Sequence, residues 1–562
     1  MISTMKNFKT FLLVVLLSSS IPAFGAEPDW VAKFLRRYRP TPNPVSAPPA
    51  PQPNAALFQG ASVAITLSDV IRLMLANNLN ISVDRLPPQI TQFLIDTYFR
   101  PFDPTLHISA NGQHSTTQST SQLNGAPSLV QLTQSYNVGF GQTLMTGTSY
   151  AVDFIMNRSS TNNAFALYNP SWVGQVRYSI SQHLLQNWGR LPSDHLIRIA
   201  QNNHRISANQ FDQQMMDLVV QAQNAYWDYV FSLEDIKVKK QSVDLAQKTL
   251  DNSRQEVEVG VLAPLDVVRA EAQVATMQDA LVVSTYTSQQ DEDTLKKIIT
   301  NRLDPGILLA KLSPVEALRL PDVADVMPVT EAIQIALENR PELRQTQLAL
   351  QNAAIDVDFT KNQILPVLDV NATYAQNGLG GVQRLRSTLG GNTVVGIVPG
   401  GLGDAFGQLF AFGYNTYSFG FNLQIPLSNK AERADHDRAI GAKVMATSQI
   451  DAVAQQIALE VRNAMNQVEM NRAHIESAQK AREFAQQTLD AEQQKYDLGV
   501  STLFFVLQDQ TNLAIAQTNE IQAMVNYTKA LVGLDRAMGQ TLLHNHIALE
   551  NGNPIVSANT AN

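Results

Sequence analysis

Residue types that support catalysis are present in this 562-residue chain, but they are scattered rather than grouped. The nine histidines show no metal-ligand spacing, and the sequence contains no Ser-His-Asp order and no paired-carboxylate cleft. Because the chain has no cysteine, a disulfide framework, a Cys-ligated metal site and a lipid-modified N-terminal cysteine are excluded. Gly401 and Gly403 have the spacing of a nucleotide loop, but no strand–turn–helix pattern surrounds them. The sequence therefore predicts no enzyme, no catalytic residue, no cofactor and no metal site.

Two short stretches instead contain residues that typically end one helix and begin the next. They are VEVGVLAPLDVVRA at 257–270 and YDLGVSTLFFVLQD at 496–509, and in each a run of helix-forming residues stops at Gly-Val and then restarts. Glycine at a helix C-terminus adopts the left-handed conformation that ends the helix. Pro264 suits the first turn of the next helix, and Ser501 or Thr502 can cap it. Each stretch is therefore predicted to be the tip of a helical hairpin.

The segments on both sides of these tips are predicted to be unusually long helices. No proline or glycine occurs between Pro192 and Gly260, and apolar residues recur every seven positions from Met215 to Val257. Such a sustained heptad pattern indicates a coiled-coil seam, and roughly 65 residues at about 1.5 Å each give a helix of about 100 Å. Several heptad frames per helix suggest two neighbours each, as in a closed ring of helices. The expected helices are 192–257, 266–301, 431–497 and 503–538.

Segments in which apolar and polar residues alternate predict β-strands, although the strands of a soluble sandwich would alternate in the same way. Their length is about that of a tilted strand that crosses a bilayer, and their apolar faces are rich in aromatic residues. The expected strands lie near 104–114, 172–183, 366–375 and 415–426, with a further hairpin candidate at 134–158 and a long glycine-rich loop at 375–415. Four to six strands cannot close a membrane barrel, which needs at least eight, so a barrel must be shared between subunits.

The sequence also contains an internal duplication. Thr66–Asn78 and Val329–Pro341 are similar helix segments, and each leads to a proline, an alternating segment and a long helix. The expected organisation is a first structural repeat at 63–303, an equatorial linker between the repeats at 304–328, a second structural repeat at 329–540 and a C-terminal tail at 541–562.

The first 62 residues are not expected to belong to the repeats. Lys6, Lys9, an apolar run and the motif Ala23-Phe24-Gly25 predict a signal peptide at 1–25, and proline-rich composition predicts an extended tether at 26–62. The chain has a formal net charge of −8 and no basic stripe, which argues against nucleic acid as a partner. Since no other stretch is long and apolar enough for a transmembrane helix, we predict an exported protein that could enter a membrane only as a β-barrel.

The most specific motifs are NRPELR at 339–344, AAIDV at 353–357, LPVL at 365–368 and QHLLQNWGR at 182–190. With these motifs the chain resembles the TolC family of outer-membrane efflux proteins over about 60–540. The resemblance implies a homotrimer that is mainly α-helical, in which four strands per subunit form a twelve-stranded outer-membrane barrel continuous with a coiled-coil periplasmic α-barrel. The hairpin at 134–158 departs from that count and either enlarges the barrel or lies in a loop; we expect the twelve-strand plan.

By this resemblance, the two hairpin tips meet the periplasmic adaptor (membrane fusion) protein of an inner-membrane pump. The alternative is that both tips are ordinary glycine-ended turns, and the sequence leaves the two interpretations equal. A repeated exposed valine beside a glycine suits a docking contact. The docking residues carried over by position are Gly260, Val261, Leu262, Ala263, Gly499, Val500, Ser501 and Thr502.

The family also closes its entrance with polar links between neighbouring hairpins, and only part of this latch is present here. Asp266 and Tyr496 match two linking positions, but the third, commonly arginine, is Ser501. A salt bridge is therefore lost, and a hydrogen bond to a charged group contributes about 1.5–3 kcal/mol at most, so a weaker latch is expected. The inner carboxylate ring of the family falls on Phe505 and Gln508, which are not acidic.

Phe505 allows two interpretations. Three Phe505 side chains around an axis would form an apolar constriction that gates by dewetting. Alternatively, Phe504 and Phe505 are seam residues in the core of their hairpin, which is the interpretation that we prefer.

These observations predict an outer-membrane exit duct of a tripartite efflux or type I secretion system, which conducts substrates passively from the periplasm to the exterior. The implied partners are two further copies of the chain, the adaptor protein, the inner-membrane pump and outer-membrane lipid. The alternatives are a periplasmic structural coiled-coil protein or adhesin, and an export-linked polysaccharide-binding or hydrolytic protein.

Overall fold

The computed structural model describes residue 38 and residues 62–120, 124–301, 308–318, 321, 327–387, 393–550 and 553–556. The predicted signal peptide at 1–25 lies outside these residues, as does nearly all of the predicted tether at 26–62. Contacts divide the chain into Met1–Ala50 and Pro51–Asn562, and the elements below belong to the second unit. Within the described ranges, each helix is too short or too polar to cross a bilayer.

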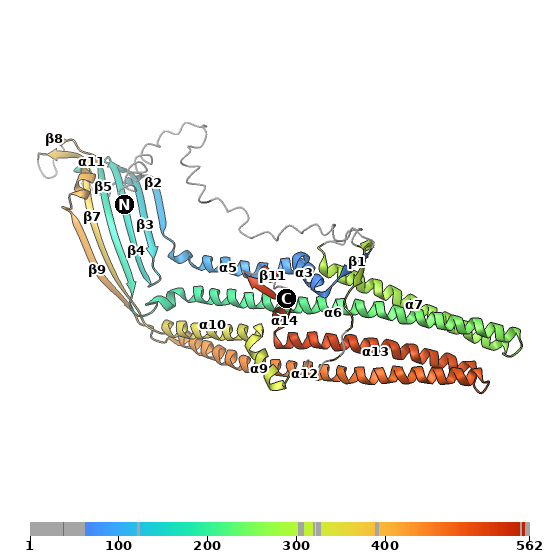
Figure 1. Cartoon of the computed structure of the whole chain (residues 1–562). Helices are drawn as coiled ribbons and strands as arrows, with labels where there is room; N and C mark the ends of the chain where they lie inside the picture. Colours follow the sequence, from blue (N-terminus) through green and yellow to red (C-terminus); the bar gives the residue numbers. More distant parts are fainter. Residues whose placement is uncertain are drawn as a thin grey trace. The chain divides into compact units, whose positions relative to one another are not determined.

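Four long helices form two antiparallel hairpins (Figure 1). Helix α6 packs along α7 and α12 packs along α13, while α13 also packs against α6 and so joins the two hairpins. Each helix end lies within two residues of its expected position. The bounds are α6 (Arg190–Glu258), α7 (Pro264–Ile299), α12 (Lys430–Asp497) and α13 (Leu503–Met538).

The heptad positions explain how these helices pack. Met215, Ala222 and Tyr229 of α6 are at most 1% exposed, and Val461 and Val468 of α12 are as deeply buried. These residues belong to two apolar cores, one for each repeat. The distance between helix axes depends on the side chains at the contact, so alanines such as Ala222 and Ala523 allow the helices to approach more closely than the large side chains beside them.

The duplication is visible in the order of the elements. In the first repeat, α3 (Leu67–Asn77) and α5 (Leu86–Tyr98) precede the strands that lead into α6. In the second repeat, α9 (Val329–Asn339) and α10 (Pro341–Gln363) precede the strands that lead into α12. Both α5 and α10 pack against α6, and α10 also packs against α12.

Short elements surround the long helices. Strand β6 (Lys311–Pro314), from the segment between the repeats, pairs in parallel with β1 (Ser62–Ile65). Helices α4 (Leu79–Asp84) and α14 (Thr541–His544) pack against α6. In the predicted tail, β10 (Ile547–Glu550) and β11 (Asn553–Val556) form a small hairpin.

An antiparallel sheet lies at the end of the helices where α6 and α12 begin (Figure 1). The strand order is β2-β3-β4-β5-β7. On the other edge of β7, the first part of the strand pairs with β9 and the last part pairs with β8. The seven described strands therefore make a sheet that is six strands wide. Their bounds are β2 (Thr105–Gln118), β3 (Ser128–Thr143), β4 (Thr148–Thr161), β5 (Tyr168–His183), β7 (Val367–Arg386), β8 (Val394–Val398) and β9 (Asn415–Gln424).

Two expectations about this sheet are wrong. The resemblance implied four strands, but the hairpin candidate at 134–158 is confirmed as β3 and β4, which pair with β2 on one side and β5 on the other. The sheet therefore lies at the upper end of the four to six strands that the alternating segments predicted. The segment 375–415 is not one long loop, because β7 continues to Arg386, β8 pairs with it, and α11 (Leu402–Phe410) packs on β7. Both differences arise from pairing between segments, which alternation within one segment does not reveal.

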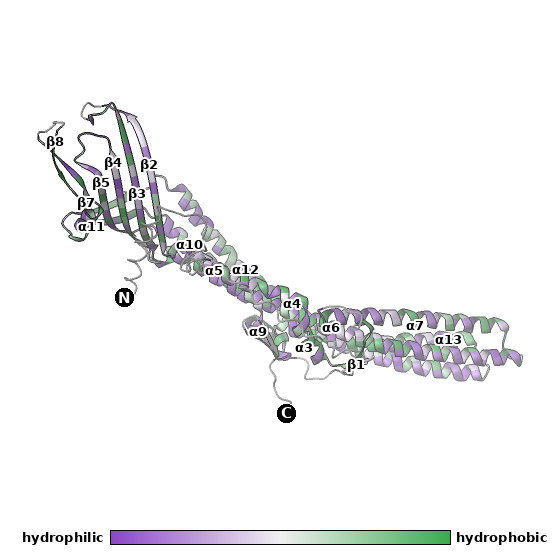
Figure 2. Cartoon of the chain, turned by 90° about the horizontal axis from the view of Figure 1, so that it is seen from above, coloured by the Kyte–Doolittle hydropathy of each residue, from purple (hydrophilic) through white to green (hydrophobic). Residues whose placement is uncertain are grey.

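The two faces of the sheet differ in polarity because side chains alternate along every strand. Figure 2 shows this alternation as apolar and polar bands on the strands. One row across all six positions consists of Leu106, Phe140, Val152, Tyr178, Tyr374 and Tyr417. The adjacent row, on the opposite face, consists of His107, Gly139, Asp153, Arg177, Ala375 and Thr416. The sheet thus has one apolar and one polar face.

A polar contact on the polar face of the sheet holds the β3–β4 hairpin between β2 and β5. Asp153 of β4 contacts Arg177 of β5 at 2.9 Å and His107 of β2 at 3.6 Å. His107 reaches across β3 because Gly139 has no side chain, and a Cβ there would overlap both the His107 ring and the Asp153 carboxylate. The contact between β2 and β4 therefore depends on glycine at this position.

We expect Gly139→Ala to lower the free energy of unfolding by about 1–3 kcal/mol, because the methyl group separates His107 from Asp153. Thermal unfolding followed by circular dichroism measures the change. Gly141→Ala is the matched control on the same strand, since its Cβ would meet Ala151 at an ordinary 3.7 Å. Equal effects of the two substitutions would contradict the role given to Gly139.

Candidate functional site

The two hairpin tips have the same backbone geometry. Gly260 and Gly499 have φ angles of 79° and 76°, in the left-handed region that glycine tolerates. Past the first glycine, the Val261 amide donates to the carbonyl of Glu256 at 2.9 Å, and past the second, the Val500 amide donates to that of Lys495 at 3.0 Å. Together with the bonds from the glycine amides, these form Schellman motifs that satisfy the last carbonyls of α6 and α12.

The tips expose apolar side chains to the outside. Val261 is 78% exposed and Val500 is 76% exposed, and each has an exposed apolar residue two positions earlier, Val259 and Leu498. Leu262 instead packs partly against the apolar cluster between the hairpins. Gly260, Ala263, Gly499 and Thr502 are exposed, and Ser501 is half-buried.

The structure gives the three latch residues different partners within one chain. The Tyr496 hydroxyl donates to Glu256 of α6 at 2.5 Å, which joins the two hairpins. Asp266 pairs with Arg269, one turn along α7, at 3.0 Å. The Ser501 hydroxyl donates to Glu492 of α12. A link between hairpins of neighbouring subunits therefore stays a prediction.

Sequence reasoning missed the two carboxylates of these contacts. Glu256 lies in the last turn of α6, where the helix dipole disfavours negative charge, and Glu492 lies one turn further from the end of α12. Hydrogen-bond donors stabilise the charge of both carboxylates. Tyr496 donates to Glu256, and Ser501 and Lys495 donate to Glu492. An acidic residue near the end of a long helix was the available signal.

The environment of each group fixes its protonation. Burial raises the pKa of Tyr496 above its ordinary value of 10.0, and the hydrogen bond to Glu256 and the charge of that carboxylate raise the pKa further. Hydrogen bonds from Ser501 and Lys495 lower the pKa of Glu492. At neutral pH, Tyr496 is therefore a hydrogen-bond donor and Glu492 is a charged acceptor.

Phe504 and Phe505 are not in the core of the hairpin. They are 51% and 53% exposed, and their rings meet edge to face with centroids 5.5 Å apart. The seam is formed instead by Leu503, Val506 and Leu507, which are at most 7% exposed. The interpretation of Phe504 and Phe505 as seam residues is therefore wrong.

The other residue at the expected inner ring is also on the surface. Gln508 is exposed and donates to Asn512 at 3.3 Å, one turn along α13. That Phe505 forms a constriction between copies stays a prediction.

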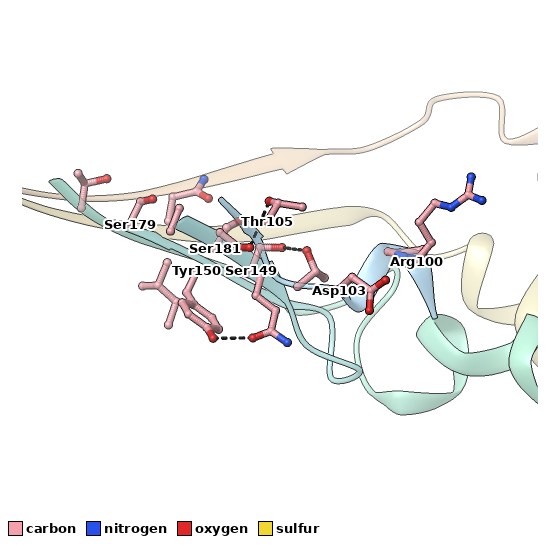
Figure 3. Close-up of a pocket in the computed structure, with 15 residues that line it drawn as sticks. Arg100, Asp103, Thr105, Ser149, Tyr150, Ser179 and Ser181 are labelled. Atoms are coloured by element: carbon pink, nitrogen blue, oxygen red, sulfur yellow. Dashed lines mark hydrogen bonds between the residues drawn. The ribbon is translucent and has the colours of Figure 1, made fainter. Parts of the chain in front are cut away.

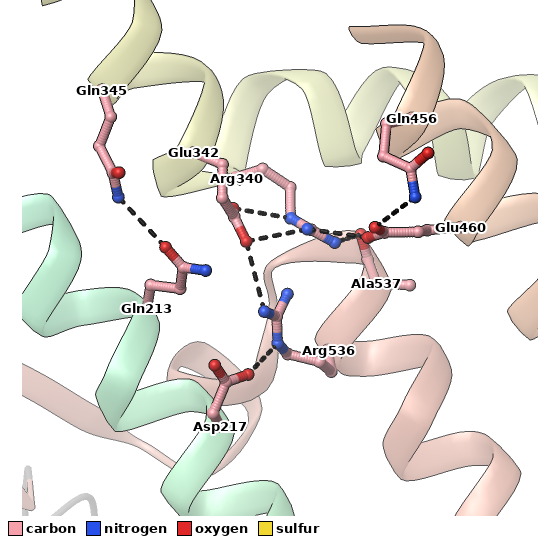
Figure 4. Close-up of polar contacts among 9 residues, drawn as sticks. All are labelled: Gln213, Asp217, Arg340, Glu342, Gln345, Gln456, Glu460, Arg536 and Ala537. Carbon is pink, nitrogen blue, oxygen red and sulfur yellow. Dashed lines mark hydrogen bonds and ion pairs between the residues drawn. The ribbon is translucent and has the colours of Figure 1, made fainter. Parts of the chain in front are cut away.

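An ionic network around the buried Arg340 holds the helices between the tips and the sheet (Figure 4). Arg340, which is 4% exposed, contacts Glu342 of α10 and Glu460 of α12, each at 2.9 Å. Arg536 of α13 contacts Asp217 of α6 at 2.5 Å and Glu342 at 3.3 Å. Burial acts to raise the pKa of Glu342, but the hydrogen bond and charge of Arg340, together with the charge of Arg536, keep it below its ordinary value.

This network explains a motif that the sequence supplied only as a resemblance. Arg340 and Glu342 belong to the NRPELR stretch at 339–344. Their partners Glu460, Arg536 and Asp217 lie on three other helices, more than 100 residues away along the chain. The motif therefore ties α10 to α6, α12 and α13.

A polar pocket of about 590 Å³ lies on the polar face of the sheet, near its junction with the helices (Figure 3). Thr105, Ser149 and Ser179 contribute hydroxyl groups to its lining, and Arg100 and Asp103 lie at its helix end. Such a surface can hold water and polar solutes. The described residues that line it include no nucleophile–base pair.

The family model described as "Outer membrane efflux protein" matches residues 151–301 and 332–540, in both structural repeats. The chain belongs to the outer membrane efflux protein family. The resemblance to the TolC family is thereby confirmed, and membership assigns this protein to the outer membrane.

Characterised relatives are distant in sequence. The pyoverdine export outer membrane protein OpmQ of Pseudomonas aeruginosa is 21% identical over 337 residues, which are 59% of this chain and 64% of OpmQ. Outer membrane protein TolC of Escherichia coli is 24% identical over 61% of this chain and 65% of TolC. This efflux family member thus spans just under two thirds of the length of these relatives.

Solved structures show that the fold is shared. The outer membrane channel CmeC of Campylobacter jejuni has a TM-score of 0.58 at 16% identity, over 84% of this chain and 86% of CmeC. The open state of the channel MtrE of Neisseria gonorrhoeae has a TM-score of 0.55 at 18% identity, over 85% of this chain and 89% of MtrE. The long helices with an attached sheet are therefore the fold of outer-membrane channels.

We expect Arg340→Met to destabilise the protein by about 3 kcal/mol, the lower end of the range for breaking a buried ion pair, because Glu460 is 39% exposed and can be solvated. The shift in thermal unfolding measured by circular dichroism tests this value. Arg462→Met, at an exposed position of α12, is the matched control and should change stability little. An equal loss of stability in both variants would show that the Arg340 network contributes no more than an exposed arginine does.

We expect Tyr496→Phe to destabilise the hairpin contact by about 1 kcal/mol, because it removes the bond to Glu256 and keeps the ring. Since the pKa of Tyr496 is raised in the folded state, the contribution of the hydroxyl is constant below about pH 10 and falls as the pH rises further. The difference in unfolding temperature between wild type and Tyr496→Phe, measured from pH 7 to 11, should narrow only at the alkaline end. A difference that narrows on acidification from pH 7 to 6 would refute this account.

Proposed function

We propose that the protein is the exit duct of a tripartite efflux or type I secretion system, and that it conducts substrates passively from the periplasm to the exterior. The observation that carries this proposal is the continuity of a two-faced sheet with two helices, α6 and α12, that are each about 100 Å long. The apolar face suits lipid and the polar face suits water, as in barrels that cross an outer membrane. Energy for transport would come from an inner-membrane pump.

The partners of the duct follow from the same arrangement. Three copies would place their hairpins around one axis, with the six tips at the periplasmic end. The exposed Val261 and Val500 would then contact a periplasmic adaptor protein, which links the duct to the pump. The formal net charge of −8 supports a mild preference for cations.

A structural coiled-coil protein of the periplasm, or an adhesin, is the main alternative function. It would use the same long helices but would need no polar surface on the sheet. The hydroxyl-lined pocket at the base of the sheet favours the duct.

Conductance separates these functions. We expect the protein, purified from outer membranes and reconstituted in planar bilayers, to give discrete single-channel currents with a reversal potential that favours cations. A monomeric, soluble product that gives no single-channel currents would contradict the duct proposal.

We expect Val261→Asp together with Val500→Asp to reduce adaptor binding at least tenfold, since a charge replaces the apolar contact at both tips. Co-purification with the adaptor and surface plasmon resonance measure the loss. Val283→Asp, an equally drastic change at a 59% exposed valine about 30 Å along α7 from the tip, is the matched control. Unchanged adaptor binding in the double variant would count against the tips as the docking surface.

A further inference from the structure

The sheet is open at both sides within the described chain. Its outermost strands are β2, which pairs with β3, and on the other side β9, which pairs with the first part of β7, and the short β8, which pairs with the last part of β7. In the described residues, the outer edge of each therefore has a row of amide and carbonyl groups that no ladder satisfies. Such edges are tolerated in lipid only when another strand pairs with them.

The directions of the two edge strands allow them to pair with each other in different copies. Strand β2 begins at Thr105, close to the helices, and runs away from them. Strand β9 runs back toward the helices and ends at Gln424, shortly before α12 begins at Lys430. Since the six positions alternate in direction, β2 of one copy is antiparallel to β9 of the next, which suits the strand ladder of a closed barrel.

The polarity of the edges matches as well. Leu106 and Ile108 of β2 lie on the apolar face, and so do Phe419 and Phe421 of β9. The latter two are 75% and 72% exposed in the single chain. Joining the two edges would continue one apolar outer face and one polar inner face around the ring.

The inserted hairpin is part of this ring rather than an appendage. Strands β3 and β4 pair along nearly their full lengths with their neighbours. The contacts of Asp153 with His107 and Arg177 span β2 to β5 on the polar face. Removing the hairpin from the sheet would break the ladders on both of its sides.

Helix α11 leaves the polar face open. Phe406 stacks on Phe154 of β4 with ring centroids 5.7 Å apart, and Phe154 shares the apolar face with Val152. A Cβ at Gly378 of β7 would overlap the backbone of Ala405, so the helix lies directly on the strand. Because α11 covers the apolar face, it does not occupy the space that the polar faces would enclose.

We propose that the β2 edge of one copy pairs with the β9 edge of a second copy, so that each copy contributes six strand positions and a trimer closes a barrel of eighteen. This inference rests on the proposed trimeric duct, and it replaces the twelve-strand plan. Barrel diameter grows roughly linearly with strand number, so the outer-membrane pore is about one and a half times as wide as twelve strands would give. Barrels of sixteen to eighteen strands leave an open aqueous channel.

Disulfide cross-linking tests the pairing, and the natural absence of cysteine makes each introduced pair the only thiols in the chain. One cysteine replaces Ser109 or Gln113 on the polar face of β2. The second is scanned along the polar face of β9, at Thr416, Ser418, Gly420 and Asn422. Directly opposed positions on paired strands are close enough for a disulfide, so we expect at least one combination to give covalent dimers and trimers after mild oxidation.

Two control cysteine pairs test whether the β3–β4 hairpin lies between β2 and β5 within one chain. Ser109→Cys with Asn137→Cys joins residues that face each other on β2 and β3, and should form an intrachain disulfide. Ser109→Cys with Gln175→Cys spans three strand spacings, about 14 Å, and should form none. An efficient Ser109–Gln175 disulfide would show that β2 pairs directly with β5, as in a four-strand plan, and would overturn the proposal.

The failure of this inference can be told apart from the failure of the duct. Single-channel currents without any β2–β9 cross-link in the scan would overturn the eighteen-position barrel and leave the duct intact. Cross-linked trimers without currents would overturn the duct and leave the shared sheet. Single-channel currents together with β2–β9 cross-linked trimers support the inference.

Discussion

Backbone amides and carbonyls need hydrogen-bond partners wherever water cannot supply them, and this requirement shapes the rest of the molecule. Within one copy, the ladders from β2 to β7 satisfy most of this requirement, but in the part of the chain that the structure describes the two outer edges of the sheet have no strand partner. Because β5 and β9 lead directly into α6 and α12, the way in which the edges are satisfied also sets where the long hairpins stand. A shared ring of strands would place those hairpins in a ring as well.

The helices are joined by apolar seams and by a few buried polar contacts. Asp235 of α6 is 9% exposed and accepts hydrogen bonds from Ser284 of α7 at 2.8 Å and Thr518 of α13 at 2.9 Å. Such contacts have only one satisfactory partner geometry, so they fix the register of helices that could otherwise slide along a uniform seam. The Arg340 network and the bond between Tyr496 and Glu256 act in the same way nearer the sheet and nearer the tips.

The two repeats are alike at their hairpin tips but differ in the strands that they contribute to the sheet. Both tips end in a glycine-terminated Schellman motif with an exposed valine. In the sheet, the first repeat contains the extra hairpin β3–β4, whereas the second contains β8 and α11. The tips are constrained by the geometry of a helix reversal, while a sheet can accept a further hairpin wherever both new edges find partners.

The sequence by itself determined the long helices, the glycine-ended tips and the duplication, because heptad periodicity and helix-ending glycines are local signals. It also marked the alternating strands, but it did not determine their number in the sheet or the extent of β7. The exposure of Phe505, the pairing of Tyr496 with Glu256 and the partners of Arg340 were decided only by the tertiary structure. Each depends on which distant segments lie side by side and in what register, and no periodicity within one segment contains that information.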